Sequence, residues 1–89
     1  MKAVITVTGK DSVGIIADVS AVCSQYKANI IEITQSVLSE YFAMIMLVEI
    51  SDLTIKFSDF ADNLSNLGAE KHLDIRAMHE DIFNSMHRI

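Results

Sequence analysis

The sequence predicts an α+β sandwich with the element order strand, helix, strand, strand, helix, strand, followed by a short C-terminal helix. Two observations carry this prediction. Four short segments are rich in β-branched and other apolar residues that either run continuously or alternate with polar ones, as strands do. Two longer segments repeat apolar residues every three or four positions, as amphipathic helices do. Because 89 residues point to one domain, these elements should share a single core.

The four predicted strands are of two kinds, and this difference predicts the order of the sheet. Continuous apolar strands cover 2–8 and 41–50, and alternating strands cover 30–38 and about 73–78. In the segment 30–38, Ile31, Ile33 and Val37 alternate with polar residues, so we expect a half-exposed strand. The continuous strands should then lie centrally in an antiparallel sheet of order 4-1-3-2, the ferredoxin-like arrangement. A partner chain, the C-terminal helix, or both should cover its second face.

The helices are predicted from apolar stripes. The first stripe consists of Ile15, Ile16, Val19, Val22, Cys23 and Tyr26. We expect Ser12 to cap this helix and Lys27 to lie at its negative end. The second helix should begin near Ser58. Gly68 either ends this helix or lies inside it where the helix crosses the sheet closely, and we favour the second alternative. The tail repeats apolar residues at helical spacing, so we divide the chain into a domain at 1–79 and a helical extension at 80–89.

Composition and charge exclude several classes of function. The formal net charge is −5 and no basic stripe is present, which argues against nucleic acid and against anionic membranes. The longest apolar run, Phe42 to Val48, is far shorter than the roughly 20 residues of a membrane span. Cys23 is the only cysteine, which argues against a disulfide scaffold and a cysteine-based zinc site. We therefore expect a cytoplasmic protein.

Two motifs resemble the ACT domain family. The run from Val4 to Ile16, VITVTGKDSVGII, is similar to the first strand of an ACT domain, followed by Asp-x-x-Gly and an aliphatic residue that opens the first helix. Ala28-Asn29-Ile30 matches the Asn-Ile start of the family's second strand. The resemblance covers about residues 2–79, and the tail resembles that of stand-alone, single-ACT bacterial proteins related to the glycine cleavage repressor. Val13 departs from the family pattern, which often has proline there.

The candidate ligand site combines the turn before the first helix with the start of the second strand: Asp11, Ser12, Val13, Gly14, Ile15, Asn29 and Ile30. The amides of Val13, Gly14 and Ile15 at a helix N-terminus would suit the carboxylate of an amino acid. We expect Gly14 to allow close approach, Asp11 to face the ammonium group, and Asn29 to offer one acceptor and two donors. The resemblance implies that such sites lie between two subunits whose sheets join side by side.

Each of these residues also has a purely structural alternative. Ser12 can serve only as a helix cap, and Gly14 can serve only to permit tight packing of the helix on the sheet. Asn29 can be the left-handed residue that ends the first helix. The sequence leaves these alternatives open.

Other reactive residue types point to structural roles. Three histidines lie near acidic residues: His72, His79 and His87. They lack metal-ligand spacing on one element, so we expect a solvated charged edge and no metal site. Cys23 lies on an apolar stripe, where we expect a small buried hydrophobe and not a nucleophile. The later methionines indicate either an adaptable binding surface or core packing: Met44, Met46, Met78 and Met86.

The function predicted is that of a regulatory, non-catalytic module. It would bind a small ligand, an amino acid, between the subunits of a homodimer and act on a separate effector protein. We recognise no nucleophile–base pair, no paired carboxylates on one element and no phosphate-binding glycine loop, and we expect no cofactor. The alternative is a protein–protein assembly module without any small ligand.

Overall fold

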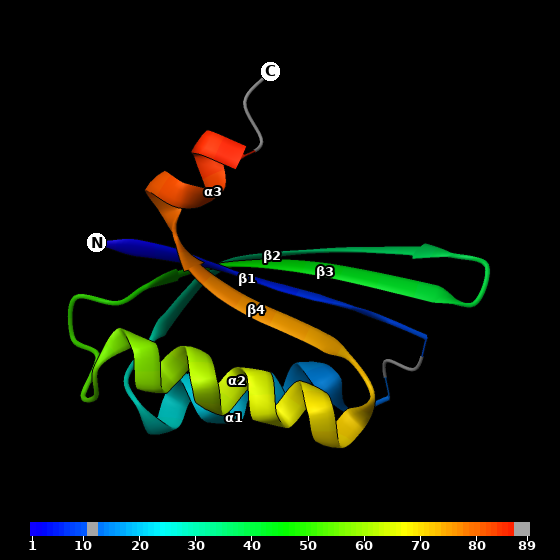
Figure 1. Ribbon diagram of the computed structural model, residues 1–89, viewed down its shortest axis with the longest axis horizontal. Helices are drawn as coiled ribbons and strands as arrows, with labels where there is room; N and C mark the ends of the chain where they lie inside the picture. Colours follow the sequence, from blue (N-terminus) through cyan, green and yellow to red (C-terminus); the bar gives the residue numbers. More distant parts are fainter. Residues whose placement is uncertain (11–12, 87–89) are drawn as a thin grey trace.

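The computed structural model describes residues 1–10 and 13–86, which form a four-stranded antiparallel sheet with two helices on one face (Figure 1). The elements in chain order are β1 (Lys2–Gly9), α1 (Ile15–Gln25), β2 (Asn29–Leu38), β3 (Tyr41–Glu49), α2 (Phe57–Lys71), β4 (Asp74–His79) and α3 (Glu80–Met86). The strand order is β2-β3-β1-β4, which confirms the predicted ferredoxin-like arrangement and the central position of the two continuous apolar strands.

The core lies between the helices and the inner face of the sheet, which we define as the face that α1 and α2 cover. Alternate residues of β1 and β3 point into it and are buried: Ala3, Ile5, Val7, Phe42, Met44, Met46 and Val48. The register places Ile5 opposite Met46 and Val7 opposite Met44. The core-packing interpretation is therefore confirmed for Met44 and Met46, whereas Met78 is half-buried and Met86 is exposed.

Gly68 lies inside α2, where the helix crosses the sheet closely, as predicted. A Cβ atom at this position would lie 2.6 Å from the carbonyl oxygen of Leu73 and 3.0 Å from Cγ1 of Ile75. The first of these atoms belongs to the backbone, so it cannot move aside as the end of a side chain can. The close contact between α2 and β4 therefore depends on a residue without a side chain.

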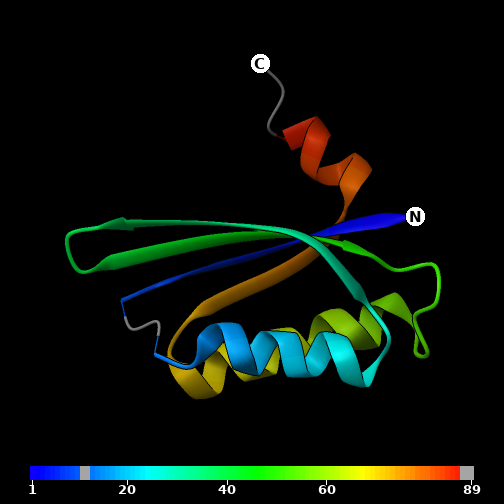
Figure 2. The same cartoon turned by 180° about the vertical axis from the view of Figure 1, so that it is seen from behind.

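The predicted half-exposed character of β2 is wrong for a single copy of the chain. All residues from 31 to 38 are exposed, including Val37 at 69% and Leu38 at 77%. A register shift between Ile30 and Glu32 also takes Ile31 out of simple alternation. The alternating pattern identifies the apolar side of the strand, but β2 is at the edge of the sheet and its hairpin with β3 extends past the helices (Figure 2).

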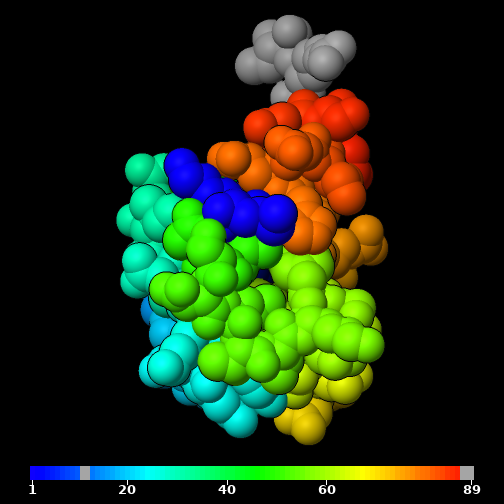
Figure 3. Space-filling model, turned by 90° about the vertical axis from the view of Figure 1, so that its left-hand side faces the viewer, coloured from blue at the N-terminus to red at the C-terminus, as the bar shows by residue number. Residues whose placement is uncertain are grey.

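The helix α3 stands on the opposite side of the sheet from α1 and α2, at the end where β4 finishes (Figures 1 and 3). It begins directly after His79, and none of its residues is buried. The tail was predicted to be helical through Ile89, and residues 87–89 lie outside the described part of the chain. Within the described part, no helix is long and apolar enough to cross a membrane.

Candidate functional site

The turn that leads into α1 is built around Gly14. This residue is the N-cap of α1, with φ 75° in the left-handed region, and its carbonyl accepts the first helical hydrogen bond, from the amide of Asp18 at 3.0 Å. The structure thus corrects two expectations: the cap position belongs to Gly14 and not to Ser12, and Val13 precedes the cap, so its amide is not among the first amides of the helix. Asp11 and Ser12 themselves lie outside the described residues.

The conformation of Gly14 excludes its predicted structural role. A Cβ atom there would meet nothing within 4 Å, so tight packing of the helix on the sheet is not the reason for a glycine. The reason is the positive φ, which residues with a Cβ atom adopt only at a cost. Because α1 begins at Ile15, its first amides are those of Gly14, Ile15, Ile16 and Ala17, and the carbonyls of the helix do not reach them.

Asn29 and Ile30 lie at the other end of α1. Asn29 is the first residue of β2 and pairs in register with Glu49, and the left-handed residue after the helix is Lys27, with φ 62°. The alternative in which Asn29 ends α1 is therefore wrong. Lys27 follows the C-cap Tyr26, so it lies at the negative end of α1, as expected, but after the last helical turn.

The predicted site residues thus form two separate groups in one chain. Gly14 and Ile15 begin α1, whereas Asn29 and Ile30 follow its end. An α-helix of 11 residues is about 16 Å long, so one copy of the chain cannot hold one small ligand with both groups.

Asn29, but not Ile30, lines a cavity of about 380 Å³, whose other lining residues are Lys27, Ala28, Glu49 and Asp52. Glu49 and Asp52 were not predicted from the sequence. The sequence places Glu49 near the end of a continuous apolar strand, where an acidic residue is a usable signal of a polar site. Together with Asn29, these side chains supply acceptors that suit an ammonium group.

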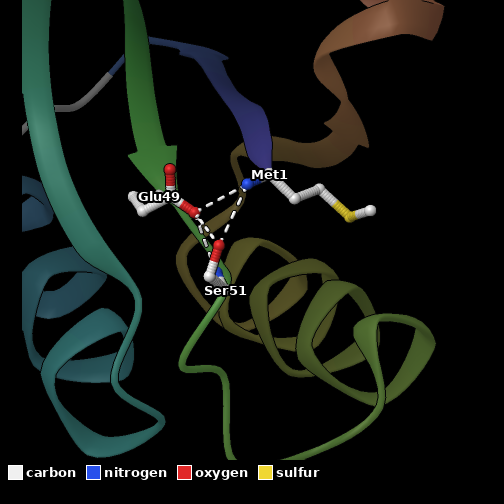
Figure 4. Close-up of polar contacts among 3 residues, drawn as sticks. All are labelled: Met1, Glu49 and Ser51. Carbon is white, nitrogen blue, oxygen red and sulfur yellow. Dashed lines mark hydrogen bonds and ion pairs between the residues drawn. The ribbon is translucent and has the colours of Figure 1, made fainter.

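Glu49 binds an ammonium group in the structure (Figure 4). Its Oε1 atom accepts hydrogen bonds from the amino group of Met1 at 2.9 Å, from the amide of Ser51 at 2.9 Å and from the hydroxyl of Ser51. The Ser51 hydroxyl and then the Met1 amino group lower the pKa of Glu49 from 4.5 to about 2. The carboxylate is thus held in its charged form at the edge of the cavity.

The remaining reactive residues take structural positions. Cys23 is buried against the core, and burial raises the pKa of its thiol to about 11, which fits a hydrophobic role. His72 is the left-handed C-cap of α2. The ring of His79 stacks on the ring of Phe57, with 4.2 Å between the two ring centroids. His87 lies outside the described residues. Among residues 1–10 and 13–86, no three His, Cys, Asp or Glu side chains come close enough together to hold a metal ion.

The comparisons with known proteins agree with this architecture. The sequence profile of the ACT domain matches residues 2–78, so the chain belongs to the ACT domain family. ACT domains are typically regulatory domains that bind small ligands. The predicted resemblance to this family is thereby confirmed.

Individual relatives extend the match to the full chain. The chain is 48% identical to a UPF0237 protein of Clostridium perfringens over 89 residues, which is 100% of both chains. Among solved structures, an ACT domain protein from Streptococcus pneumoniae is similar with a TM-score of 0.80 and 38% identity over 93% of each chain. A putative glycine cleavage system transcriptional repressor is similar with a TM-score of 0.70 and 25% identity, over 86% of this chain and 44% of that one.

Proposed function

We propose that this chain is a non-catalytic regulatory ACT domain that binds an amino acid between two copies of itself. The observation that carries the proposal is the separation of the two candidate groups, Gly14 with Ile15 and Asn29 with Ile30, by the length of α1, next to an exposed edge strand. A site that is split between the ends of one helix becomes complete when a second copy lies antiparallel to the first.

The edge strand β2 provides the contact between copies. Its residues from 31 to 38 are exposed, and several are large and apolar, so an added strand would bury surface and pair the free edge. In an antiparallel β2–β2 pair, the start of one strand meets the end of the other. The end of β2 lies near the turn, because Val37 pairs with Phe42 and Phe42 pairs with Gly9. Asn29 of one copy therefore comes toward the Gly14 turn of the other.

The residues at the start of α1 and those at the start of β2 together complement the two charges of an amino acid, its carboxylate and its ammonium group. The first amides of α1, at Gly14 and Ile15, suit the carboxylate of the ligand. Asn29 and the acidic residues beside it suit the ammonium group, and Asp11 is a further candidate for the same role. A bound amino acid would favour the dimer, and a separate effector protein would recognise that dimer. The cytoplasmic location and the division at residue 79 stay predictions.

The first test is a thermal unfolding panel of the full chain with each amino acid. A ligand at about 100 times its dissociation constant adds about 2.7 kcal/mol to the stability of the folded state. In a domain of this size, this raises the unfolding midpoint by about 10–20 °C. We expect one or two amino acids to give such a shift, and a panel without any shift contradicts ligand binding.

Two variants locate the binding site. Asn29→Ala should weaken binding by about tenfold or more, because it removes a hydrogen bond to a charged group. Asn66→Ala, at an exposed position on α2, is the matched control. Gly14→Asn keeps a residue that tolerates positive φ and places a side chain over the first amides of α1. Unchanged affinity in both site variants contradicts the split site.

A second candidate function is an assembly module without a small ligand. The exposed apolar edge of β2 alone favours it, because this edge needs a partner whether or not a ligand is present. Both functions need two copies to pair at the β2 edge. Sedimentation of the Val37→Lys variant, with Asp62→Lys on α2 as control, tests this pairing. A dimer that Val37→Lys disrupts, combined with a thermal panel that shows no shift, supports assembly over sensing.

A further inference from the structure

The outer face of the sheet, opposite α1 and α2, is apolar along β3 but covered only at one end. Val4 is buried and Met78 half-buried where α3 contacts β1 and β4. Farther along the same face, Ile45 is 44% exposed and Tyr41 is 53% exposed. Thus α3 shields the end of the sheet where β4 finishes, and the end at the β2–β3 hairpin is left uncovered.

The uncovered end contains a cavity of about 320 Å³ on the sheet. Mostly apolar atoms line it, from the end of β1, the end of β2 and the start of β3: Thr8, Gly9, Ser36, Leu38, Tyr41, Phe42 and Ala43. Most of these residues belong to the outer face, since Ala43 pairs with Thr8 on one side and with Ser36 on the other. A shallow apolar hollow of this kind suits one or two apolar side chains.

The helix α3 carries side chains of this type without a place to bury them in its own chain. Ile82 is 52% exposed and Met86 is 65% exposed. The helix stands above the rest of the molecule in the space-filling view (Figure 3). A helix of two turns is not stable by itself in water, so an apolar side that is left uncovered indicates a missing contact.

The helix of one chain cannot reach the cavity of the same chain. Ala3 lies opposite His79 and Thr8 lies opposite Asp74, so five residues, or about 17 Å, separate the start of α3 from the cavity along the strands. The seven residues of α3 span about 10 Å, and no loop joins α3 to β4. If α3 packs into such a cavity, it must therefore do so in another molecule.

Local charge favours a second copy of this chain as that molecule. The chain is acidic overall, yet a cation lies at the rim of the cavity: the Lys10 ammonium is 5.7 Å from the centre of the Tyr41 ring and 3.8 Å from Glu40. The first turn of α3 carries Glu80 and Asp81. The pair between Lys10 and Glu40 is long and exposed, so Lys10 can also pair with an acidic helix, and α3 thus offers apolar side chains to the cavity and carboxylates to the lysine beside it.

We propose that the outer face is an interface between two copies of this chain, in which α3 of each copy packs into the cavity at the β2–β3 hairpin of the other. The helix and the cavity lie at opposite ends of the strands, so a two-fold contact can form both pairs at once and close the assembly. This interface is distinct from the β2 edge and does not depend on ligand binding.

Cross-linking between two variants tests the contact directly. Ile82→Cys is mixed with Ala43→Cys, each with a different affinity tag, and the mixture is treated with a short thiol-to-thiol cross-linker. Native Cys23 is buried and contributes little background. We expect several times more cross-linked heterodimer than from Ile82→Cys mixed with Ala69→Cys, which places the thiol on α2. Equal yields from the two mixtures overturn the proposal.

Sedimentation supplies a second, independent readout. Ile82→Glu should weaken this association by about tenfold or more, whereas Ala69→Glu should leave it unchanged. Val37→Lys should weaken pairing at the β2 edge and leave the yield of the 82–43 cross-link intact, so failure of one interface can be told from failure of the other. A wild-type chain that stays monomeric at high micromolar concentration overturns the proposal, and it leaves the outer face to an unrelated partner.

Discussion

The inner and outer faces of the sheet contain similar residues in different surroundings, and β3 shows this residue by residue. Phe42, Met44 and Met46 point to α1 and α2 and are buried, whereas Tyr41 and Ile45 point to the outer face and are about half exposed. The alternation of the strand decides which residues share a face. The neighbouring elements decide whether that face is buried. In one copy of the chain, the inner face therefore stabilises the fold and the outer face is available for association.

The largest expected effect is the difference in stability between truncating an inner-face residue of β3 and truncating its outer-face neighbour. Met46→Ala should lower the free energy of unfolding by about 2–5 kcal/mol, because it leaves a cavity in the core. Ile45→Ala should change it by at most about 0.5 kcal/mol at concentrations where the chain is monomeric. Urea denaturation of both variants measures the difference. Similar losses in the two variants would mean that the outer face is also part of the core of a single chain.

An intermediate effect is expected at Gly68, where the inner face and α2 are closest. Gly68→Ala should lower the free energy of unfolding by about 1–3 kcal/mol, because the new Cβ atom would press on the backbone carbonyl of Leu73. Elsewhere in a helix, the same change stabilises by about 0.4–1 kcal/mol. Ser65→Ala, at an exposed position of α2, is the control. A stabilised Gly68→Ala protein would show that the helix can move away from β4.

The smallest expected effect concerns the polar end of β3. The pKa of Glu49 is lowered from 4.5 to about 2, so its contribution to stability is fully present above pH 4.5 and is lost as the pH falls toward 2. Over this interval, wild-type protein should lose more stability on acidification than Glu49→Gln does. Thermal midpoints at several pH values measure this difference, with Glu70→Gln on α2 as the control. Parallel curves for wild type and Glu49→Gln would mean that the contacts with Ser51 and Met1 do not persist in solution.

The sequence was sufficient for the sheet order, because two strands are apolar on both faces and such strands need a neighbour on each side. For Gly68 it left two positions open, the end of the second helix or its interior, and the favoured interior position is confirmed. It was not sufficient for the start of α1. Ser12 has the residue type of a good cap, but Gly14 is the residue that adopts the positive φ on which the turn depends.

The order of the predicted elements already separates Gly14 from Asn29 by the first helix, and the family resemblance implies a site between two subunits. The sequence could not show which side chains lie beside each group, such as Glu49 and Asp52 beside Asn29. The exposure of β2 was missed for the same reason, because alternation does not reveal which elements cover a strand. Glu49 was overlooked because its partners, Met1 and Ser51, include a residue 48 positions away in the chain.

The central position of β1 has a consequence for how the chain folds. Ala3 pairs with Val48 on one side and with His79 on the other, so the first strand finds both of its neighbours only after most of the chain exists. Such distant pairings slow folding relative to helical bundles of the same length. During synthesis, β1 and the β2–β3 hairpin can form a three-stranded sheet first, and the position next to β1 stays open until β4 is made. A nascent chain is thus exposed to strand exchange at that position until its last quarter has been translated.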